Sequence, residues 1–139
     1  MRVLAIDHGL ARCGCAISDP TGTIVRPLDV VEPPDAGAVA DVAKAERAER
    51  VVVGLPLSLD GTEGEQAQLV REFCEQLAAA VQVPVETWDE RLTTAMAGAS
   101  RRSGARAAED SLAAAHLLDS YLAAAARPEA AGERGEGTR

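Results

Sequence analysis

The sequence predicts an α/β fold in which a five-stranded mixed sheet carries helices on both faces. Two observations predict it. The first 31 residues hold three strand-like runs that are separated by turn signals. The rest of the chain alternates stretches of helical spacing with short apolar runs. The expected order of elements is therefore β-β-β-α-β-α-β-α, an antiparallel meander followed by α/β units.

The meander is expected to consist of short strands joined by tight turns. The strands span Val3–Ile6, Cys13–Ser18 and Thr23–Val31. The first is a continuous apolar run, as expected of a central strand. Gly9 and Gly14 bracket the first turn, and Asp19-Pro20-Thr21-Gly22 is typical of the second. Pro27 has no backbone N–H to donate, so we expect its strand at an edge of the sheet or at a bulge.

The α/β units follow Pro33-Pro34, which breaks the chain. Helices are expected from Asp35 or the residues just after it to about Arg47, over Glu63–Val81 and over Ala108–Ala126, and strands over Arg50–Leu55 and Val83–Trp88. The middle helix has an apolar face formed by Ala67, Val70, Phe73, Cys74 and Leu77. We expect one domain over residues 1–126 and a disordered tail over 127–139, which is rich in Gly, Glu and Ala.

The composition narrows the classes of function. The chain has a net charge of −8 and only three aromatic residues, Phe73, Trp88 and Tyr121. It therefore lacks an aromatic platform for stacking single-stranded bases, and its bulk charge does not favour non-specific binding of nucleic acid. Any such contact must depend on a local basic patch or on bound cations. The sequence shows no signal peptide and no membrane-spanning apolar run, so we expect a soluble, cytoplasmic protein without a membrane partner.

The cysteines are Cys13, Cys15 and Cys74, an odd number that implies no disulfide framework. Cys13 and Cys15 alternate in phase with a strand, so both side chains are expected on one buried face. A zinc site would need further ligands, and His8 and His116 are the only histidines.

The last expected helix carries an acid on its apolar face. Counted from Asp110, apolar or small residues recur at offsets of 3, 4, 7, 8, 11 and 12, namely Ala113, Ala114, Leu117, Leu118, Tyr121 and Leu122. Asp119 lies off this stripe and is expected in solvent. Because burial of an unpaired carboxylate is costly, the position of Asp110 requires a specific reason.

Other acids stand at the ends of strands. Asp7 ends the first apolar strand, and Asp89 and Glu90 end the fifth. Strand alternation sends Asp89 and Glu90 to opposite faces, so at most one of them joins a shared site unless the strand bends. Simpler interpretations stay open. Asp7 could cap backbone N–H groups of its own turn, and Arg91 could pair with one of the later acids at the surface.

A site of several carboxylates has a defined chemistry. Carboxylates brought together by folding repel one another, so some must be protonated or a cation must bind. Hard oxygen ligands suit Mg²⁺ or Mn²⁺, and two such ions can activate water and stabilise the leaving oxygen of a phosphodiester. The candidate metal ligands and catalytic residues are therefore Asp7, one of Asp89 and Glu90, and Asp110.

Residues 91–106 form a basic segment between these acids, with four arginines and no acid. The arginines are Arg91, Arg101, Arg102 and Arg106. In a chain this acidic, the segment is the best candidate for gripping a phosphate backbone. The alternative is an exposed and solvated loop.

Four motifs follow one another along the chain: Leu4-Ala5-Ile6-Asp7-His8-Gly9 with Arg12, Gly14, Ala16 and Asp19; Val53-Gly54-Leu55-Pro56-Leu57 with Asp60-Gly61 and Gly64; Asp89-Glu90-Arg91-Leu92-Thr93-Thr94 with Ala97; and Ser100-Arg101-Arg102 followed by Asp110, Ala113-Ala114, Leu118 and Ser120-Tyr121-Leu122. In these motifs the chain resembles, over residues 1–124, the YqgF/RuvX family, described as pre-16S rRNA nucleases and as Holliday-junction resolvase-like proteins. His8, Ser58 and Glu109 depart from the family's pattern.

The resemblance implies an RNase H-like fold with acids at Asp7, within Asp89-Glu90 and at Asp110, in agreement with the spacing argument. We favour Glu90 over Asp89 because its longer side chain reaches further from a strand end. Two ions, Mg²⁺ or Mn²⁺, are then expected, with Asp7 bridging them. The expected substrate-binding residues are Arg12, Arg91, Thr93, Thr94, Arg101, Arg102 and Arg106.

The expected function is hydrolysis of phosphodiester bonds in nucleic acid, with processing of the 5′ end of pre-16S rRNA in ribosome biogenesis as the favoured role. Alternatives are a Holliday-junction resolvase-like DNA nuclease and a non-catalytic RNA-binding module for ribosome assembly. The expected partner is pre-rRNA, or branched or single-stranded DNA, and a symmetric cut of a junction would require a homodimer. The hairpin also resembles that of actin-like ATPases and sugar kinases, but those need two lobes and 139 residues supply one.

Overall fold

The computed structural model describes residues 1–93 and 106–126, which form a five-stranded sheet and three α-helices. The strands are β1 Val3–His8, β2 Cys13–Ser18, β3 Val25–Val31, β4 Arg50–Leu55 and β5 Val85–Asp89. The helices are α1 Ala36–Ala45, α2 Glu65–Ala80 and α3 Arg106–Ala126, and a short 3-10 turn, η1, spans Glu90–Leu92. The order of elements that the sequence predicts is confirmed.

The sheet is mixed, with the strand order β3-β2-β1-β4-β5. β2 pairs antiparallel with both β1 and β3, whereas β1, β4 and β5 run parallel. Pro27 lies in edge strand β3, where the missing N–H is tolerated as expected. The carboxyl ends of the parallel strands meet at one edge of the sheet, which is where ligands bind in open α/β sheets.

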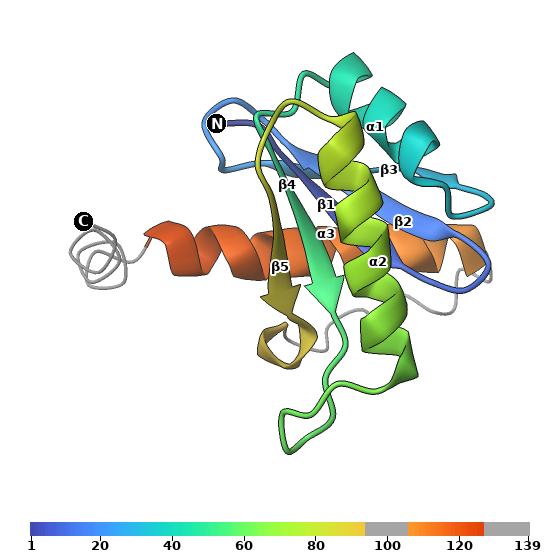
Figure 1. The fold of residues 1–139 in the computed structure, drawn as a ribbon. Helices are drawn as coiled ribbons and strands as arrows, with labels where there is room; N and C mark the ends of the chain where they lie inside the picture. The colour runs from blue at the N-terminus through green and yellow to red at the C-terminus, as the bar shows by residue number, and fades with distance from the viewer. Residues whose placement is uncertain (94–105, 127–139) are drawn as a thin grey trace, which may run out of the picture.

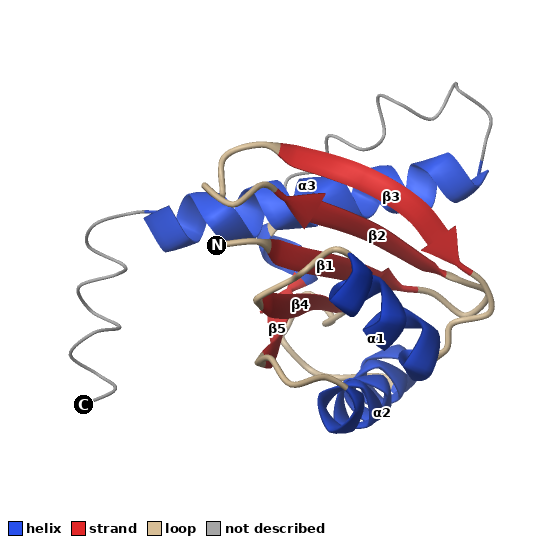
Figure 2. Cartoon of the chain, turned by 90° about the horizontal axis from the view of Figure 1, so that it is seen from above, coloured by secondary structure: helices blue, strands red, loops and turns tan. Residues whose placement is uncertain are grey.

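Helices cover both faces of the sheet, so the molecule is layered α/β/α (Figures 1 and 2). α1 and α2 lie on one face, and α3 crosses the other. Alternation along β1 divides its side chains between two cores. Leu4 and Ile6 join the core beneath α1 and α2, whereas Val3 and Ala5 join the core beneath α3. The face to which a strand residue points therefore decides which helix it can meet.

Local signals in the sequence behave as expected. Asp35 caps α1, because its carboxylate accepts a hydrogen bond of 2.8 Å from the backbone N–H of Ala38. Cys13 and Cys15 are fully buried in the core beneath α1 and α2. Burial raises the pKa of both thiols to about 12. Both cysteines are therefore inert core residues.

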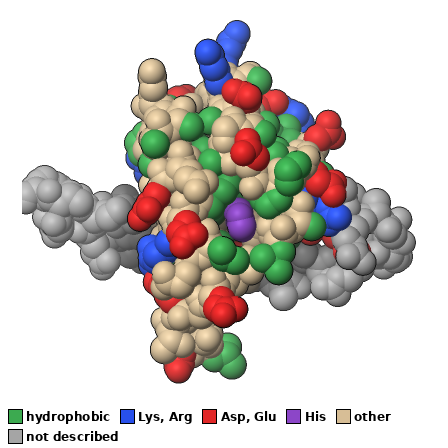
Figure 3. Space-filling view, turned by 45° about the vertical axis from the view of Figure 1, so that its right-hand side comes forward, with side chains coloured by type: hydrophobic (Ala, Val, Ile, Leu, Met, Phe, Trp, Pro, Cys, Tyr) green, Lys and Arg blue, Asp and Glu red, His purple; other side chains and the backbone are tan. Residues whose placement is uncertain are grey.

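The surface of the described residues is acidic. Figure 3 shows carboxylate side chains spread across one face of the molecule, with apolar side chains between them. This agrees with the net charge of −8 for the chain. Within residues 1–93 and 106–126, no helix has the length and the apolar character needed to cross a membrane.

Candidate active site

Asp7 is the next-to-last residue of β1 and points to the face that α3 covers. Its side chain is in phase with Val3 and Ala5, which pack beneath α3. The next residue, His8, points to the opposite face, where its ring lies 4.7 Å from that of Phe73 in α2, centroid to centroid. The side chains of Asp7 and His8 therefore point to opposite faces of the sheet, and Asp7 is the one beside α3.

Glu90 reaches the same face because β5 alternates in the same way. Trp88 packs against Tyr121 of α3 with ring centroids 5.5 Å apart, and Glu86 accepts a hydrogen bond of 2.8 Å from the Tyr121 hydroxyl. Glu90 is the next residue in this phase and opens η1. Asp89 is out of phase and points to the other side, as strand alternation predicts.

Gly54 in β4 leaves the space through which Glu90 approaches Asp7. β4 lies between β1 and β5, so the Glu90 side chain must pass over it. A Cβ atom at Gly54 would lie 2.7 Å from Glu90 Oε2 and 2.5 Å from Leu117 Cδ1, closer than real Cβ contacts allow. The glycine therefore opens the route that brings the two carboxyl groups together.

The electrostatics of this pair are those of two acids that share a proton. Burial raises the pKa of Glu90 to about 7, and the charge of Asp7 and a hydrogen bond to Asp7 act in the same direction. Burial also raises the pKa of Asp7, and Asp110 adds to this effect through its charge. The pair therefore retains a proton to a higher pH than separate carboxyl groups would, in a hydrogen bond between Glu90 and Asp7.

Asp7 and Glu90 line a small cavity at the carboxyl edge of the sheet. The cavity has a volume of about 170 Å³, and its other walls are Thr93, Ala113 and Leu117. Thr93 Oγ1 is buried and finds no hydrogen-bond partner among the residues that the structure describes. A buried hydroxyl without a partner is costly, so its position favours a polar ligand in this cavity.

Asp110 lies beside the pair because α3 approaches β2 very closely at Gly14. Gly14 pairs with Asp7 across the β1–β2 ladder. A Cβ atom at Gly14 would lie only 2.0 Å from the backbone carbonyl oxygen of Asp110. The absence of a side chain at Gly14 therefore lets the first turns of α3 rest directly on the strand position opposite Asp7.

The Asp110 carboxylate, however, is engaged by Arg12. Arg12 Nη1 lies 3.1 Å from Asp110 Oδ2, and Arg12 Nη2 lies 3.8 Å from Glu32 Oε2. Among the described residues, no group of three or more His, Cys, Asp or Glu side chains is arranged to hold a metal ion. The structure thus brings Asp7 and Glu90 together and places Asp110 next to them, but with its carboxylate turned to an arginine.

The donor set fits a hard divalent cation in part. Asp7 and Glu90 supply carboxylate oxygens, and Thr93 adds a hydroxyl that lacks a partner. Mg²⁺ and Mn²⁺ prefer such oxygens and retain several waters, so two carboxylates and a polar wall suffice for one ion. A second ion would require Asp110 to leave Arg12 and turn into the cavity.

The expected substrate-binding residues fall into three groups. Thr93 lines the cavity. Arg12 and Arg91 are held in ion pairs, Arg12 with Asp110 and Arg91 with Asp89. Thr94, Arg101 and Arg102 lie outside the described residues, as does the side chain of Arg106, which begins α3.

Sequence reasoning missed the roles of Gly14 and Gly54. We expected Gly14 to bracket a turn, whereas it lies within β2 under the backbone of α3. A usable signal exists for both, because a glycine inside an apolar strand often marks the close approach of another segment. What the sequence could not show is which segment approaches.

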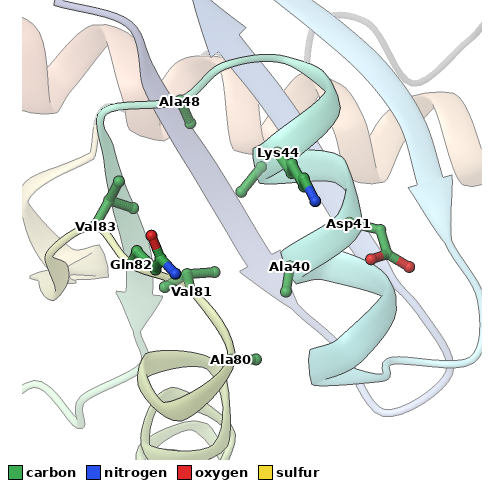
Figure 4. Close-up of a pocket in the computed structure, with 9 residues that line it drawn as sticks. Ala40, Asp41, Lys44, Ala48, Ala80, Val81, Gln82 and Val83 are labelled. Carbon is green, nitrogen blue, oxygen red and sulfur yellow. The ribbon is translucent and has the colours of Figure 1, made fainter.

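A larger hollow lies away from these acids, between α1 and the link from α2 to β5. Its volume is about 430 Å³, and it is lined by Ala40, Asp41, Ala43, Lys44, Ala48, Ala80, Val81, Gln82 and Val83. Figure 4 shows small apolar side chains on both walls, with the carboxylate of Asp41 turned away from the Val81 side. Asp41 and Lys44 are the only charged side chains in this lining, and it holds no pair of carboxyl groups like that of Asp7 and Glu90, so the smaller cavity is the candidate active site.

Two solved structures with a similar fold are resolvases bound to junction DNA. A Thermus thermophilus RuvC in complex with a Holliday junction substrate matches with a TM-score of 0.58 at 21% identity, and the match covers 88% of this chain and 95% of that one. A fowlpox virus resolvase in complex with Holliday junction DNA matches with a TM-score of 0.59 at 11% identity, covering 91% and 100%. The expected RNase H-like fold is thereby confirmed.

Closer relatives are found by sequence. A protein of Anaeromyxobacter sp. (strain K) is 42% identical over 132 residues, with 88% of this chain and 96% of that protein covered. A protein of Syntrophus aciditrophicus is 40% identical, with 88% of each chain covered. Both carry the name "Putative pre-16S rRNA nuclease". Residues 1–124 match the family model described as "RuvX: Holliday junction resolvase", and the chain therefore belongs to the RuvX family.

Proposed function

We propose that this protein is a divalent-metal-dependent nuclease that hydrolyses phosphodiester bonds in nucleic acid at the Asp7–Glu90 cavity. The observation that carries the proposal is the pair of carboxyl groups that share one cavity with an unpartnered hydroxyl. Two carboxyl groups this close repel each other unless a proton or a cation lies between them, so packing of the fold does not explain why both are present. Membership of a family of nucleases supports the same reaction class.

The residues of the chain divide the work as follows. Asp7 and Glu90 would hold Mg²⁺ or Mn²⁺, and Asp110 would complete the set when it turns away from Arg12. When bound, the metal supplies Lewis acidity to the scissile phosphate and lowers the pKa of a water molecule. Thr93 would orient a phosphate oxygen or a water molecule through its hydroxyl. Ala113 and Leu117 form the apolar wall that limits access of bulk water.

The substrate is proposed from the relatives. Their name points to pre-16S rRNA, and we propose its 5′ end as the place of cleavage, which would place the protein in the cytoplasm. Arg101, Arg102 and Arg106 are the proposed contacts to the phosphate backbone, because a chain with a net charge of −8 needs a local basic segment for this purpose. The family description points instead to a four-way DNA junction, for which a homodimer would be required.

Replacement of one acid tests the proposal. Asp7→Asn removes a negative charge from the cavity while keeping the size of the side chain, so cleavage should fall to the level of the enzyme-free control. The matched control is Asp119→Asn, an exposed acid of α3 that lies outside the cavity. Labelled pre-rRNA leader and a four-way DNA junction should be assayed side by side with Mg²⁺ and with Mn²⁺.

The outcomes are distinct. Faster cleavage of one of the two substrates identifies the nucleic acid on which the protein acts. An Asp7→Asn variant that cleaves as fast as the wild type would contradict the assignment of the active site to the Asp7–Glu90 cavity. A wild-type protein that binds the RNA without cutting it, with affinity unchanged in the variant, would favour the RNA-binding assembly module. The engagement of Asp110 by Arg12 is the observation on the side of that alternative.

A further inference from the structure

The segment that follows β5 separates its side chains between two sides of the sheet. Glu90 and Thr93 line the cavity beside α3. Asp89 and Arg91 lie on the other side, toward the loop that joins β4 to α2. Figure 1 shows η1 and this loop at the same end of the sheet. A side chain that points away from the cavity can still control it through the turn that carries Glu90.

Arg91 makes a dense set of contacts on that side. Its Nε lies 3.1 Å from both Asp89 oxygens, and its Nη2 lies 2.7 Å from Asp89 Oδ2. Its Nη1 donates to the backbone carbonyls of Leu59 at 3.1 Å and of Ser58 at 3.4 Å. Asp89 also accepts a hydrogen bond of 2.9 Å from the backbone N–H of Arg91, which caps η1.

The loop that receives Arg91 has an ordered backbone of its own. Ser58 donates from its backbone N–H to Thr62 at 2.9 Å, and Gly61 donates to Ser58 at 2.8 Å. Asp60 accepts from the backbone and the hydroxyl of Thr62 at 3.0 and 2.8 Å. The Arg91 guanidinium therefore ties η1 to a compact loop and not to a single freely moving carbonyl.

A second tie holds η1 from the side of α3. The hydroxyl of Ser120 donates a hydrogen bond of 2.8 Å to the backbone carbonyl of Leu92. The turn is thus fastened from both sides of the sheet, and the residues that it aims into the cavity are Glu90 and Thr93.

We propose that Arg91 is a positioning residue which, with Asp89, braces η1 against the β4–α2 loop and so aims Glu90 and Thr93 into the cavity. The geometry speaks against a role as a phosphate ligand, because all three guanidinium nitrogens of Arg91 already have protein partners. The proposal rests on the nuclease function proposed above. It assigns to Arg91 a role different from the substrate contact that the sequence suggests.

The two roles of Arg91 predict opposite results for Asp89→Asn. If Arg91 is a brace, loss of its carboxylate partner loosens η1, and kcat falls by about 10- to 100-fold with KM unchanged, because misplaced supporting groups act on the chemical step. If Arg91 grips phosphate, loss of the partner frees its charge, so KM falls and kcat is kept. Arg91→Gln and Arg91→Lys should behave like Asp89→Asn under the brace, since a lysine cannot reproduce the planar fork.

Arg71→Gln is the matched control. Arg71 forms a similar forked ion pair with Glu63, at 2.6 to 2.9 Å, at the surface and outside the candidate site. Its loss should leave kcat and KM at the wild-type values. Exposed ion pairs contribute little to stability, so none of these variants should unfold the protein.

A readout that needs no cleavage decides the proposal independently. Amide hydrogen exchange of residues 58–61 and 90–93 should become at least several-fold faster in Arg91→Gln and Asp89→Asn and stay unchanged in Arg71→Gln. Binding of Mn²⁺ alone should weaken several-fold in the same two variants. Unchanged exchange together with a raised KM in Arg91→Gln overturns the brace and leaves the nuclease assignment intact. Faster exchange in a protein that never cleaves keeps the brace and overturns the nuclease.

Discussion

Asp7 and Glu90 bring two carboxyl groups into one cavity, and this determines how the protein responds to pH. Burial raises the pKa of Glu90 from 4.5 to about 7. Because the folded value lies above the unfolded one, the folded state binds this proton more tightly. The stability from this group is therefore fully present below pH 4.5 and is lost as the pH rises through about 7.

We expect Glu90→Gln to be more stable than the wild type at alkaline pH in the presence of a chelator. The full shift corresponds to roughly 3 kcal/mol, and partial solvent exposure reduces it, so the gain between about pH 5 and about pH 8 should be about 1 kcal/mol. Urea unfolding at several pH values measures it. The lowered pKa of His8 acts in the opposite direction at low pH, but it is common to both proteins and cancels in the difference.

Mn²⁺ provides the complement to this measurement. A cation competes with the shared proton, so its addition should raise the melting temperature of the wild type more at pH 8 than at pH 6. Glu90→Gln should show a smaller rise. Equal rises in both proteins would mean that the ion binds elsewhere.

At the scale of elements, the close approach of α3 to β2 decides where Asp110 lies. The facing residues are small, with Gly14 and Ala16 in β2 and Ala114 and Ala115 in α3. Small residues allow the helix backbone to rest on the sheet, and at Gly14 no space remains for even one carbon atom. The position of Asp110 relative to Asp7 is therefore set by packing of the helix and not by a local turn.

Gly14→Ala tests this arrangement. The added Cβ would meet the backbone carbonyl of Asp110, so α3 must shift, and we expect a loss of about 1–3 kcal/mol in the free energy of unfolding. Nuclease activity should fall by more than the loss of folded protein explains, because Asp110 moves with the helix. Gly64→Ala is the control, since a Cβ there would meet nothing within 4 Å. Similar losses in both variants would contradict the account.

The sequence predicted the elements well where apolar runs and turn signals agree. The bounds of β2 and β4 are those expected, and β1 continues two residues beyond Ile6 because the ladder with β2 extends to His8. Alternation also predicted that Asp89 and Glu90 separate. We favoured Glu90 over Asp89 because its side chain is longer. The structure adds a second reason, since Glu90 points to the same face of the sheet as Trp88, which is the face that α3 covers.

The parts that sequence reasoning could not predict depend on contacts between distant segments. Arg12 and Asp110 are 98 positions apart, and no local pattern shows that they pair. The bond from Arg91 to Leu59 spans 32 positions in the same way. An arginine that binds phosphate and an arginine that binds a carboxylate or a backbone carbonyl look alike in sequence, so the residue type alone could not assign these partners.

At the scale of the whole molecule, the described cores and the family match end at nearly the same place. The last residue packed into the α3 core is Leu122, and the family model matches residues 1–124. A chain that ends at Ala126 should therefore have the melting temperature of the full chain. Differential scanning calorimetry of both chains measures this, and a clearly lower value for the short chain would refute a domain confined to residues 1–126.

The alternation of side chains along β1 limits which insertions and deletions this strand can accept. Asp7 and His8 belong to opposite layers, and a one-residue shift of a strand exchanges its two sides. A single inserted or deleted codon within β1 would thus turn the acid toward Phe73 and the imidazole toward α3. We therefore expect changes of length to be tolerated in the loops, and a change of length within β1 to be tolerated only in steps of two residues.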